Sequence, residues 1–262
     1  MPEKDTVNMM VMAGTKDAAN IIKKLSSTGK FNILATTTTE YGANIAKSAG
    51  ANYVLSGKLN EKELINAIKT RKIGILVDAT HPFAAAATRN AIKASEMTKI
   101  RYMRFERPKE VLNENYLIHK VYSFEEAASK VLELTNSEDN ILHLAGVLTL
   151  KNITKKVENK RIYARVLPSI DSIKECLDLG LKNENIIAMQ GTFSKEFNKA
   201  LMEEFNISLI ITKESGETGG TGTKIEAALD LCIHIIIVMR PEIEELSGKE
   251  IFSNIEELCN HL

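Results

Sequence analysis

Short apolar runs alternate with longer segments of helical periodicity along the whole chain of 262 residues. Runs such as LIIT (209–212) and HIIIVM (234–239) are typical of strands buried on both faces of a parallel sheet. Because helical segments separate the strands, the pattern predicts right-handed βαβ units and a doubly wound α/β fold. Strands are expected near 8–12, 32–35, 53–55, 73–77, 100–103, 117–121, 140–144, 161–164, 186–189, 208–211 and 234–239.

These strands are too many for one compact open sheet of this type. We therefore expect two Rossmann-like parallel-sheet domains with a ligand cleft between them. The segment ERPKEVLNEN (106–115) is rich in charge and contains Pro and Asn, so it is the expected boundary. We assign residues 1–107 to an N-terminal domain and 108–262 to a C-terminal domain, with the option that the last helix, near 252–262, packs back on the first domain.

Composition excludes several kinds of partner. Lys and Arg total 34, as do Asp and Glu, so the formal net charge is zero. General nucleic-acid and membrane-surface binders carry a basic excess, and we expect neither partner. The cysteines are few and far apart, and no His, Cys or Asp cluster has ligand spacing, so we expect no metal site. The chain start does not resemble a signal peptide and no apolar run could span a bilayer, which predicts a cytoplasmic protein.

Candidate binding residues follow the predicted strands of the first half. Gly14 and Thr15 stand at a helix start after the first strand, where backbone N–H groups can approach a phosphate, although an ordinary turn capped by Thr15 is slightly favoured on spacing alone. TTTTEYG (36–42) follows the second strand and offers hydroxyls and Glu40 but no Arg. A polar turn is the strong alternative there.

DATHPFA (78–84) is the sharpest local signal of the first half. It places Asp78 and His81 together after the fourth strand, and His is readily adapted to proton transfer or anion binding. The alternative is that Asp78 caps backbone N–H groups and His81 is a partly buried spacer. Beyond the fifth strand, Arg104 and Arg107 suit carboxylates or phosphates, unless they belong to a solvated linker.

A glycine-rich segment, TKESGETGGTGTK (212–224), follows a buried strand in the second half. Its glycines, with Lys213 and Lys224, suit a loop that wraps closely around an anion. The segment is not a Walker A loop, because Gly222 is followed by Thr223 rather than by Lys and a hydroxyl residue. A flexible surface loop is the weaker alternative.

Taken in order, these motifs resemble those of the precorrin-6A reductases of cobalamin biosynthesis, including the cobalt-precorrin-6A reductases of the anaerobic route. The resemblance runs through nearly the whole chain and rests on AGTKD, EYG, VDATHPFA, RFERP, ARVLP, NIIAMQGTFSKEFN, ITKESGETGGTGTKIEAA and VMRP. It implies an NAD(P)H-dependent oxidoreductase that reduces a ring double bond of cobalt-precorrin-6A to give cobalt-precorrin-6B. It also implies a nicotinamide-binding N-terminal domain and a tetrapyrrole polycarboxylate as substrate.

The resemblance implies roles for individual residues. His81 and Lys213 are the catalytic candidates, with solvent as a third source of the proton. The cofactor-binding candidates are Gly14, Thr15, Thr37, Thr38, Glu40, Ser215, Gly216, Gly219 and Thr221. The substrate-binding candidates are Asp78, Thr80, Arg104, Arg107, Arg165, Lys224 and Arg240.

The loop TTTTEYG favours NADH, with NADPH as the alternative, because no cation there awaits a 2′-phosphate. It also resembles the anaerobic-route members, which favours the cobalt-containing substrate. A metal-free precorrin-6A reductase and a non-catalytic nucleotide or tetrapyrrole binder stay open as alternatives. We expect a monomer or a small homo-oligomer.

Overall fold

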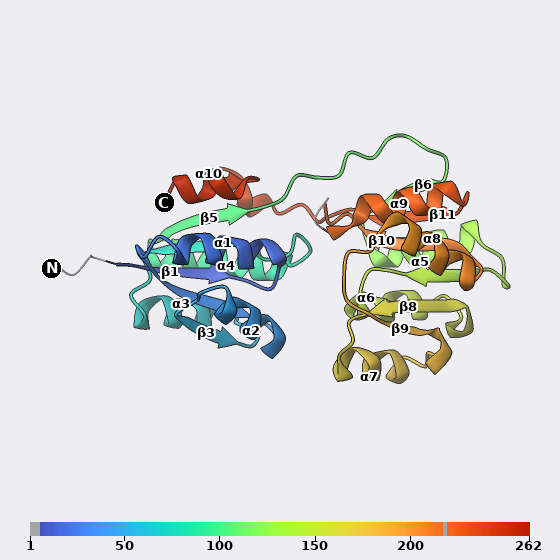
Figure 1. Cartoon of the computed structure of the whole chain (residues 1–262), viewed down its shortest axis with the longest axis horizontal. Helices are drawn as coiled ribbons and strands as arrows, with labels where there is room; N and C mark the ends of the chain where they lie inside the picture. The colour runs from blue at the N-terminus through green and yellow to red at the C-terminus, as the bar shows by residue number, and fades with distance from the viewer. Residues whose placement is uncertain (1–5, 217–218) are drawn as a thin grey trace. The chain divides into compact units, whose positions relative to one another are not determined.

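The computed structural model describes residues 6–216 and 219–262, so Glu217 and Thr218 of the glycine-rich segment lie outside the described residues. The chain divides into two compact units. Unit 1 comprises residues 1–108 and 241–262, and unit 2 comprises residues 109–240. Figure 1 shows the elements of both units.

Unit 1 contains a six-stranded parallel sheet in the order β12-β5-β4-β1-β2-β3. Its elements are β1 (Val7–Met12), α1 (Lys16–Ser26), β2 (Phe31–Thr37), α2 (Glu40–Ser48), β3 (Tyr53–Ser56), α3 (Glu61–Thr70), β4 (Ile75–Asp78), α4 (Ala85–Thr98), β5 (Arg101–Phe105), β12 (Glu250–Phe252) and α10 (Ile255–Asn260).

Helices cover both faces of this sheet, and the central strand β1 shows why. Met9 and Val11 are buried in one core cluster, which also holds apolar residues of α1 and α10. Met10 and Met12 are buried in a second cluster with residues of α3 and α4. Since successive side chains of a strand point to opposite faces, β1 is apolar at almost every position.

Unit 2 contains a second six-stranded parallel sheet in the order β6-β11-β10-β7-β8-β9. Helices α8 and α9 pack against each other and against β10. The elements are β6 (Ile118–Val121), α5 (Phe124–Leu134), β7 (Asn140–His143), α6 (Val147–Thr154), β8 (Ile162–Val166), α7 (Ile170–Asp178), β9 (Ile186–Ala188), α8 (Lys195–Glu204), β10 (Ile207–Lys213), α9 (Thr221–Asp230) and β11 (His234–Val238). The predicted fold class of two Rossmann-like parallel-sheet domains is confirmed.

Hydroxyl and amide side chains define most helix starts. The N-cap residue accepts a backbone hydrogen bond from the first turn at Thr15, Thr39, Asn60, Ser123, Ser169, Ser194 and Asn254. Helices α4, α6 and α9 differ, because among the described residues no side chain caps them. Their first N–H groups are therefore left for other partners.

The C-terminal segment packs on the first domain, in line with the option stated for the last helix. Residues 241–262 lie in unit 1, whose first stretch ends at residue 108. The reason is strand β12, which the sequence did not predict: it pairs in parallel with β5, and α10 then packs near α1 (Figure 1). Within residues 6–216 and 219–262, no helix has the length and hydropathy that a bilayer crossing requires.

Replacement of Leu258 in α10 should test this assignment. Its side chain is 0% exposed in the α1 core cluster of unit 1, so Leu258→Ala should lower the free energy of unfolding by about 2–5 kcal/mol. Urea unfolding followed by circular dichroism measures the change. Ile251→Ala, at a side chain that is 49% exposed, is the control and should cost much less. Equal costs would show that α10 does not complete the core.

Candidate active site

The order of strands in unit 1 creates a topological switch point between β1 and β4. The loops after these two strands meet at the carboxyl edge of the sheet, where ligands bind in doubly wound folds. The Oγ1 hydroxyl of Thr15 donates a hydrogen bond to the carbonyl of Ala79 at 2.9 Å and accepts one from the N–H of Ala18 at 3.0 Å. Thr15 therefore joins the two loops and also caps α1.

The backbone of Gly14, at the switch point of unit 1, is sterically accessible. Its φ is +114°, a conformation that favours glycine, and a Cβ built on it would meet nothing within 4 Å. A ligand can therefore approach the main chain closely at the start of α1. This property fits the role expected of Gly14.

The β2–α2 loop presents polar groups of neutral or negative charge. Thr37 is buried and donates to the carbonyl of Thr39 at 3.1 Å, while Thr38 and Glu40 are exposed. Residues 36–42 include no Lys or Arg. The loop itself thus offers hydroxyls and a carboxylate.

Asp78 lies at the centre of a buried hydrogen-bond network at the end of β4. Its carboxylate accepts from the N–H of Thr80 at 3.0 Å and from the hydroxyl of Tyr102 at 3.0 Å, and it pairs with Arg104 at 2.9 Å. Asp78 and Arg104 are both 0% exposed. These two side chains hold the loop and each other, so as described they are enclosed rather than presented to a ligand.

One buried donor of this network, Nη2 of Arg104, has no hydrogen-bond partner among the described residues. Arg104 also donates to the hydroxyl of Thr80 at 3.0 Å and to Glu106 at 3.3 Å. Burial and the adjacent Asp78 carboxylate raise the pKa of Tyr102 well above its ordinary value, so Tyr102 stays a neutral hydrogen-bond donor. Sequence reasoning missed Tyr102, because a tyrosine in an apolar strand has no motif around it.

His81 comes directly after this network and is half-buried. Its Nδ1 accepts a hydrogen bond from the N–H of Phe83 at 3.2 Å, which selects the neutral tautomer with the hydrogen on Nε2. Arg107 pairs with Asp17 in the first turn of α1 at 2.5 Å. The charges of Arg104 and Arg107 are therefore balanced by acidic residues within unit 1.

Unit 2 has an equivalent switch point between β7 and β10. The helices after these strands are α6 and α9, whose N-cap residues Gly146 and Gly220 have φ of +83° and +67°. Uncapped N-termini are favourable positions for negative charge. The hydroxyl of Thr221 accepts from the N–H of Ser215 at 3.2 Å and donates to the carbonyl of Lys213 at 3.2 Å, which holds the ends of the glycine-rich loop together.

Three cationic side chains lie near this switch point. Burial lowers the pKa of Lys213 to about 8. The pKa of Lys224 also falls to about 8, because of burial first and then the nearby charges of Arg165 and Lys213. Because the charges of Arg165 and Lys213 both act on Lys224, these three sequence-predicted side chains of β8, β10 and α9 lie in one neighbourhood.

The contacts of Arg165 and Lys224 in the described structure are with neutral groups. Arg165 donates to the side-chain carbonyl of Asn198 at 2.9 Å and lies 4.9 Å from the centre of the Phe193 ring. Lys224 donates to the carbonyl of Gly219 at 3.3 Å. Such a buried excess of positive charge is unfavourable unless an anion binds, so the site is suited to a carboxylate or a phosphate.

Arg240 does not share this character. Its Nε and Nη2 groups both bind the carboxylate of Glu214, the second at 2.8 Å, and Glu214 is 0% exposed. Arg240, like Arg104, is enclosed and paired with a buried carboxylate, so as described neither guanidinium is presented to a substrate. Sequence reasoning missed Glu214, although its position directly after β10 was an available signal.

His143 ends β7 within the same unit and is fully buried. Burial lowers its pKa to about 4, so it is neutral at pH 7. Its Nε2 lies 3.1 Å from the hydroxyl of Thr149 and 3.2 Å from the carbonyl of Gly146. Its hydrogen-bonding contacts are therefore with neighbouring groups of the same unit.

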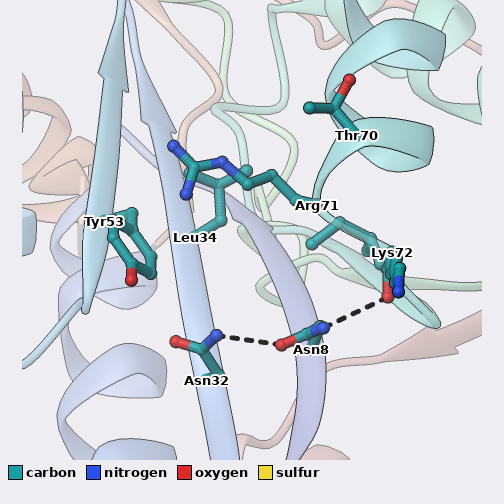
Figure 2. Close-up of a pocket in the computed structure, with 8 residues that line it drawn as sticks. Asn8, Asn32, Leu34, Tyr53, Thr70, Arg71 and Lys72 are labelled. Carbon is teal, nitrogen blue, oxygen red and sulfur yellow. Dashed lines mark hydrogen bonds between the residues drawn. The ribbon is translucent and has the colours of Figure 1, made fainter.

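A separate pocket of about 200 Å³ lies near the opposite, amino-terminal edge of the unit 1 sheet. Figure 2 shows Asn32 bonded to Asn8, and Arg71 beside Tyr53. None of the predicted site residues lines it. Across residues 6–216 and 219–262, no group of three or more His, Cys, Asp or Glu side chains is arranged to hold a metal ion.

The fold defines a Rossmann-like α/β protein of two units, each with a switch point at the carboxyl edge of its sheet, the usual place for ligands in such folds. Residues 8–262 match the family described as Precorrin-6x reductase CbiJ/CobK. The chain belongs to this family of reductases of cobalamin biosynthesis, which use NAD(P)H as a class.

Relatives agree over nearly the whole length. The cobalt-precorrin-6A reductase of Methanothermobacter thermautotrophicus is 44% identical over 260 residues, covering 99% of this chain and 85% of that protein. That of Methanocaldococcus jannaschii is 41% identical and covers 98% of both chains. A solved CobK precorrin-6A reductase has a TM-score of 0.79 at 19% identity, covering 98% of this chain and 96% of that one, and supports the fold.

The lowered pKa of Lys224 predicts how stability changes with pH. Between about pH 8 and 10.5 the unfolded chain holds the lysine proton and the folded chain does not, so the folded state gains stability as the pH rises through this window. Lys224→Met should remove a gain on the order of 3 kcal/mol. Denaturant unfolding of both proteins at pH 7.5 and 10 measures it. Lys155→Met, at an exposed lysine, is the control and should leave the pH dependence of the free energy of unfolding as in the wild type. The same pH dependence in Lys224→Met would contradict the burial of the Lys224 charge.

Proposed function

We propose that this chain reduces cobalt-precorrin-6A to cobalt-precorrin-6B, with NADH as the preferred reductant. The observation that carries the proposal is the 44% identity, over 99% of the chain, to a protein named for that substrate. Relatives named for the cobalt-containing substrate are 26–44% identical, whereas those named for metal-free precorrin-6A are 26% identical over less of the chain. This difference favours the cobalt form.

Unit 1 is proposed to bind the dinucleotide. The fit rests on the open backbone at Gly14 and on the link from Thr15 to the β4 loop. Thr37, Thr38 and Glu40 would lie on the ribose side, where a carboxylate suits the 2′-hydroxyl of NADH. The absence of Lys and Arg from residues 36–42 leaves a 2′-phosphate without a countercharge from that loop.

Unit 2 is proposed to bind carboxylates of the tetrapyrrole. Arg165 and Lys224 carry the argument, because their described contacts are with neutral groups while the substrate is a polycarboxylate. The glycine-rich loop, with the uncapped start of α9, would close over an anionic group of substrate or cofactor. The loop residues in this role are Ser215, Gly216, Gly219 and Thr221.

Reduction of the ring double bond needs a hydride and a proton. Reduced nicotinamide supplies the hydride when it is bound. His81 is a candidate for the proton in its imidazolium form, because a histidine is readily adapted to proton transfer near neutral pH. The neutral tautomer that Phe83 selects would first have to take up a proton. Lys213 is the other candidate, because its lowered pKa of about 8 makes it a better proton donor near neutral pH than an ordinary lysine. Solvent is the third.

Anaerobic mixing of the purified protein with cobalt-precorrin-6A and either NADH or NADPH tests the reaction. We expect loss of nicotinamide absorbance together with a two-hydrogen gain in the mass of the macrocycle, faster with NADH. Turnover with NADPH alone would refute the interpretation of the β2–α2 loop. Turnover only with metal-free precorrin-6A would favour that substrate, and binding without turnover of either would favour a carrier on the same fold.

His81→Ala should lower turnover by about 100-fold or more if the imidazole donates the proton. The dissociation constant for the nicotinamide should change much less, because the substitution leaves Gly14 and Thr15 in place. Steady-state kinetics and a fluorescence titration of the reduced cofactor give the two values. His261→Ala, at an exposed histidine of unit 1, serves as the control. Wild-type turnover in His81→Ala would assign the proton to Lys213 or to solvent.

A further inference from the structure

Glu214 binds three separate parts of unit 2 with one buried carboxylate. Oε1 accepts from the N–H of Gly216 at 3.2 Å, from the N–H of Glu110 at 3.0 Å and from Arg240 Nη2 at 2.8 Å, while Oε2 accepts from Arg240 Nε. The side chain is 0% exposed. The glycine-rich loop, the beginning of the unit and the segment after β11 therefore converge on this group.

The charge of this carboxylate is already balanced. A buried carboxylate is costly without countercharge and donors, and Arg240 supplies both through two nitrogens. Neither partner is left to attract a ligand, which distinguishes the pair from Arg165 and Lys224. The loop bond to Gly216, whose φ is +70°, is instead a constraint on backbone shape.

Unit 1 repeats this arrangement at the equivalent place. In both sheets the strand beside the switch point ends at a buried carboxylate: Asp78 at the end of β4 and Glu214 directly after β10. Each accepts from the N–H two residues later, and each pairs with an arginine from the next strand region along the sheet, Arg104 or Arg240. The two units therefore hold the backbone after a central strand in the same way, with a buried carboxylate–arginine pair, although their sequences differ.

We propose that Glu214 is a positioning residue for the reaction: it fixes the backbone of Gly216, whose carbonyl accepts from the N–H of Gly219, so that the start of α9 and Lys224 meet an anionic group. The role rests on the proposed function. It acts through Gly216 and requires no contact between Glu214 and substrate.

A double variant separates positioning from stability. Replacing a buried ion pair by apolar residues is often neutral for folding, whereas loss of one partner is strongly destabilising. Glu214→Leu/Arg240→Leu should therefore unfold at a midpoint closer to wild type than Glu214→Leu alone, with the remaining cost coming from the N–H groups of Gly216 and Glu110 that lose their acceptor. Glu214→Gln keeps the shape but leaves Arg240 without countercharge. Asp139→Asn, a carboxylate of unit 2 that bonds the N–H of Asn136 near the start of β7, is the matched control.

The first measurement is amide hydrogen exchange at Gly216 in the protein without ligands. We expect about tenfold or greater loss of protection in the double variant and none in Asp139→Asn, since a hydrogen bond to a charged group is lost. Unchanged protection at Gly216 would overturn the proposal, whatever the enzyme reduces.

The second measurement is the kinetics of reduction. The double variant should raise KM for the macrocycle at least tenfold, with a smaller effect on kcat, whereas a merely stabilising pair would leave both near wild type. A wild-type KM in a variant whose loop amide has lost protection would also overturn the proposal. If the wild-type protein reduces no precorrin, the proposed function fails, but the exchange result still decides whether Glu214 shapes the loop.

Discussion

The buried carboxylate–arginine pair is the interaction on which both ligand edges depend. Asp78 with Arg104 holds the loop of unit 1, and Glu214 with Arg240 holds the loop of unit 2. In each sheet the pair stands beside the strand-order reversal, where the loops after two neighbouring strands lead to opposite sides of the sheet. Charged hydrogen bonds in a dry environment are strong enough to fix such irregular backbone. In each unit, the pair fixes the backbone of the loop that follows a central strand.

Charge is distributed differently over the two units despite their common topology. In unit 1, Arg104 pairs with Asp78 and Glu106, and Arg107 pairs with Asp17. Unit 2 collects Arg165, Lys213 and Lys224 at one edge, and burial and mutual repulsion depress the pKa of Lys224. A net charge of zero for the whole chain conceals this contrast. Under the proposed function, this contrast would let a neutral protein attract a polyanionic substrate to one local site.

The candidate loops were predicted from the residues directly after each strand, at Gly14, at His81 and in the glycine-rich segment, and their roles in binding stay predictions. The motifs in order indicated the family, which is confirmed. The roles of Asp78, Arg104 and Arg240 were harder to predict, because a charged residue beside a strand end serves a ligand or a neighbour equally well by sequence. Tyr102 and Glu214 were missed, since their importance comes from partners contributed by other strands.

The amino-acid sequence by itself determined most of the secondary structure, though not β12, and the parallel α/β class, because hydrophobic periodicity and helix caps are local properties. It also carried the family motifs. Only the tertiary structure decided that β12 completes the first sheet, that Arg104 and Arg240 are enclosed by carboxylates, and that Arg165 and Lys224 contact neutral groups. These facts depend on which strands become neighbours. Strand order brings distant residues together through long-range packing, and no local pattern specifies the partner that a buried charge will find.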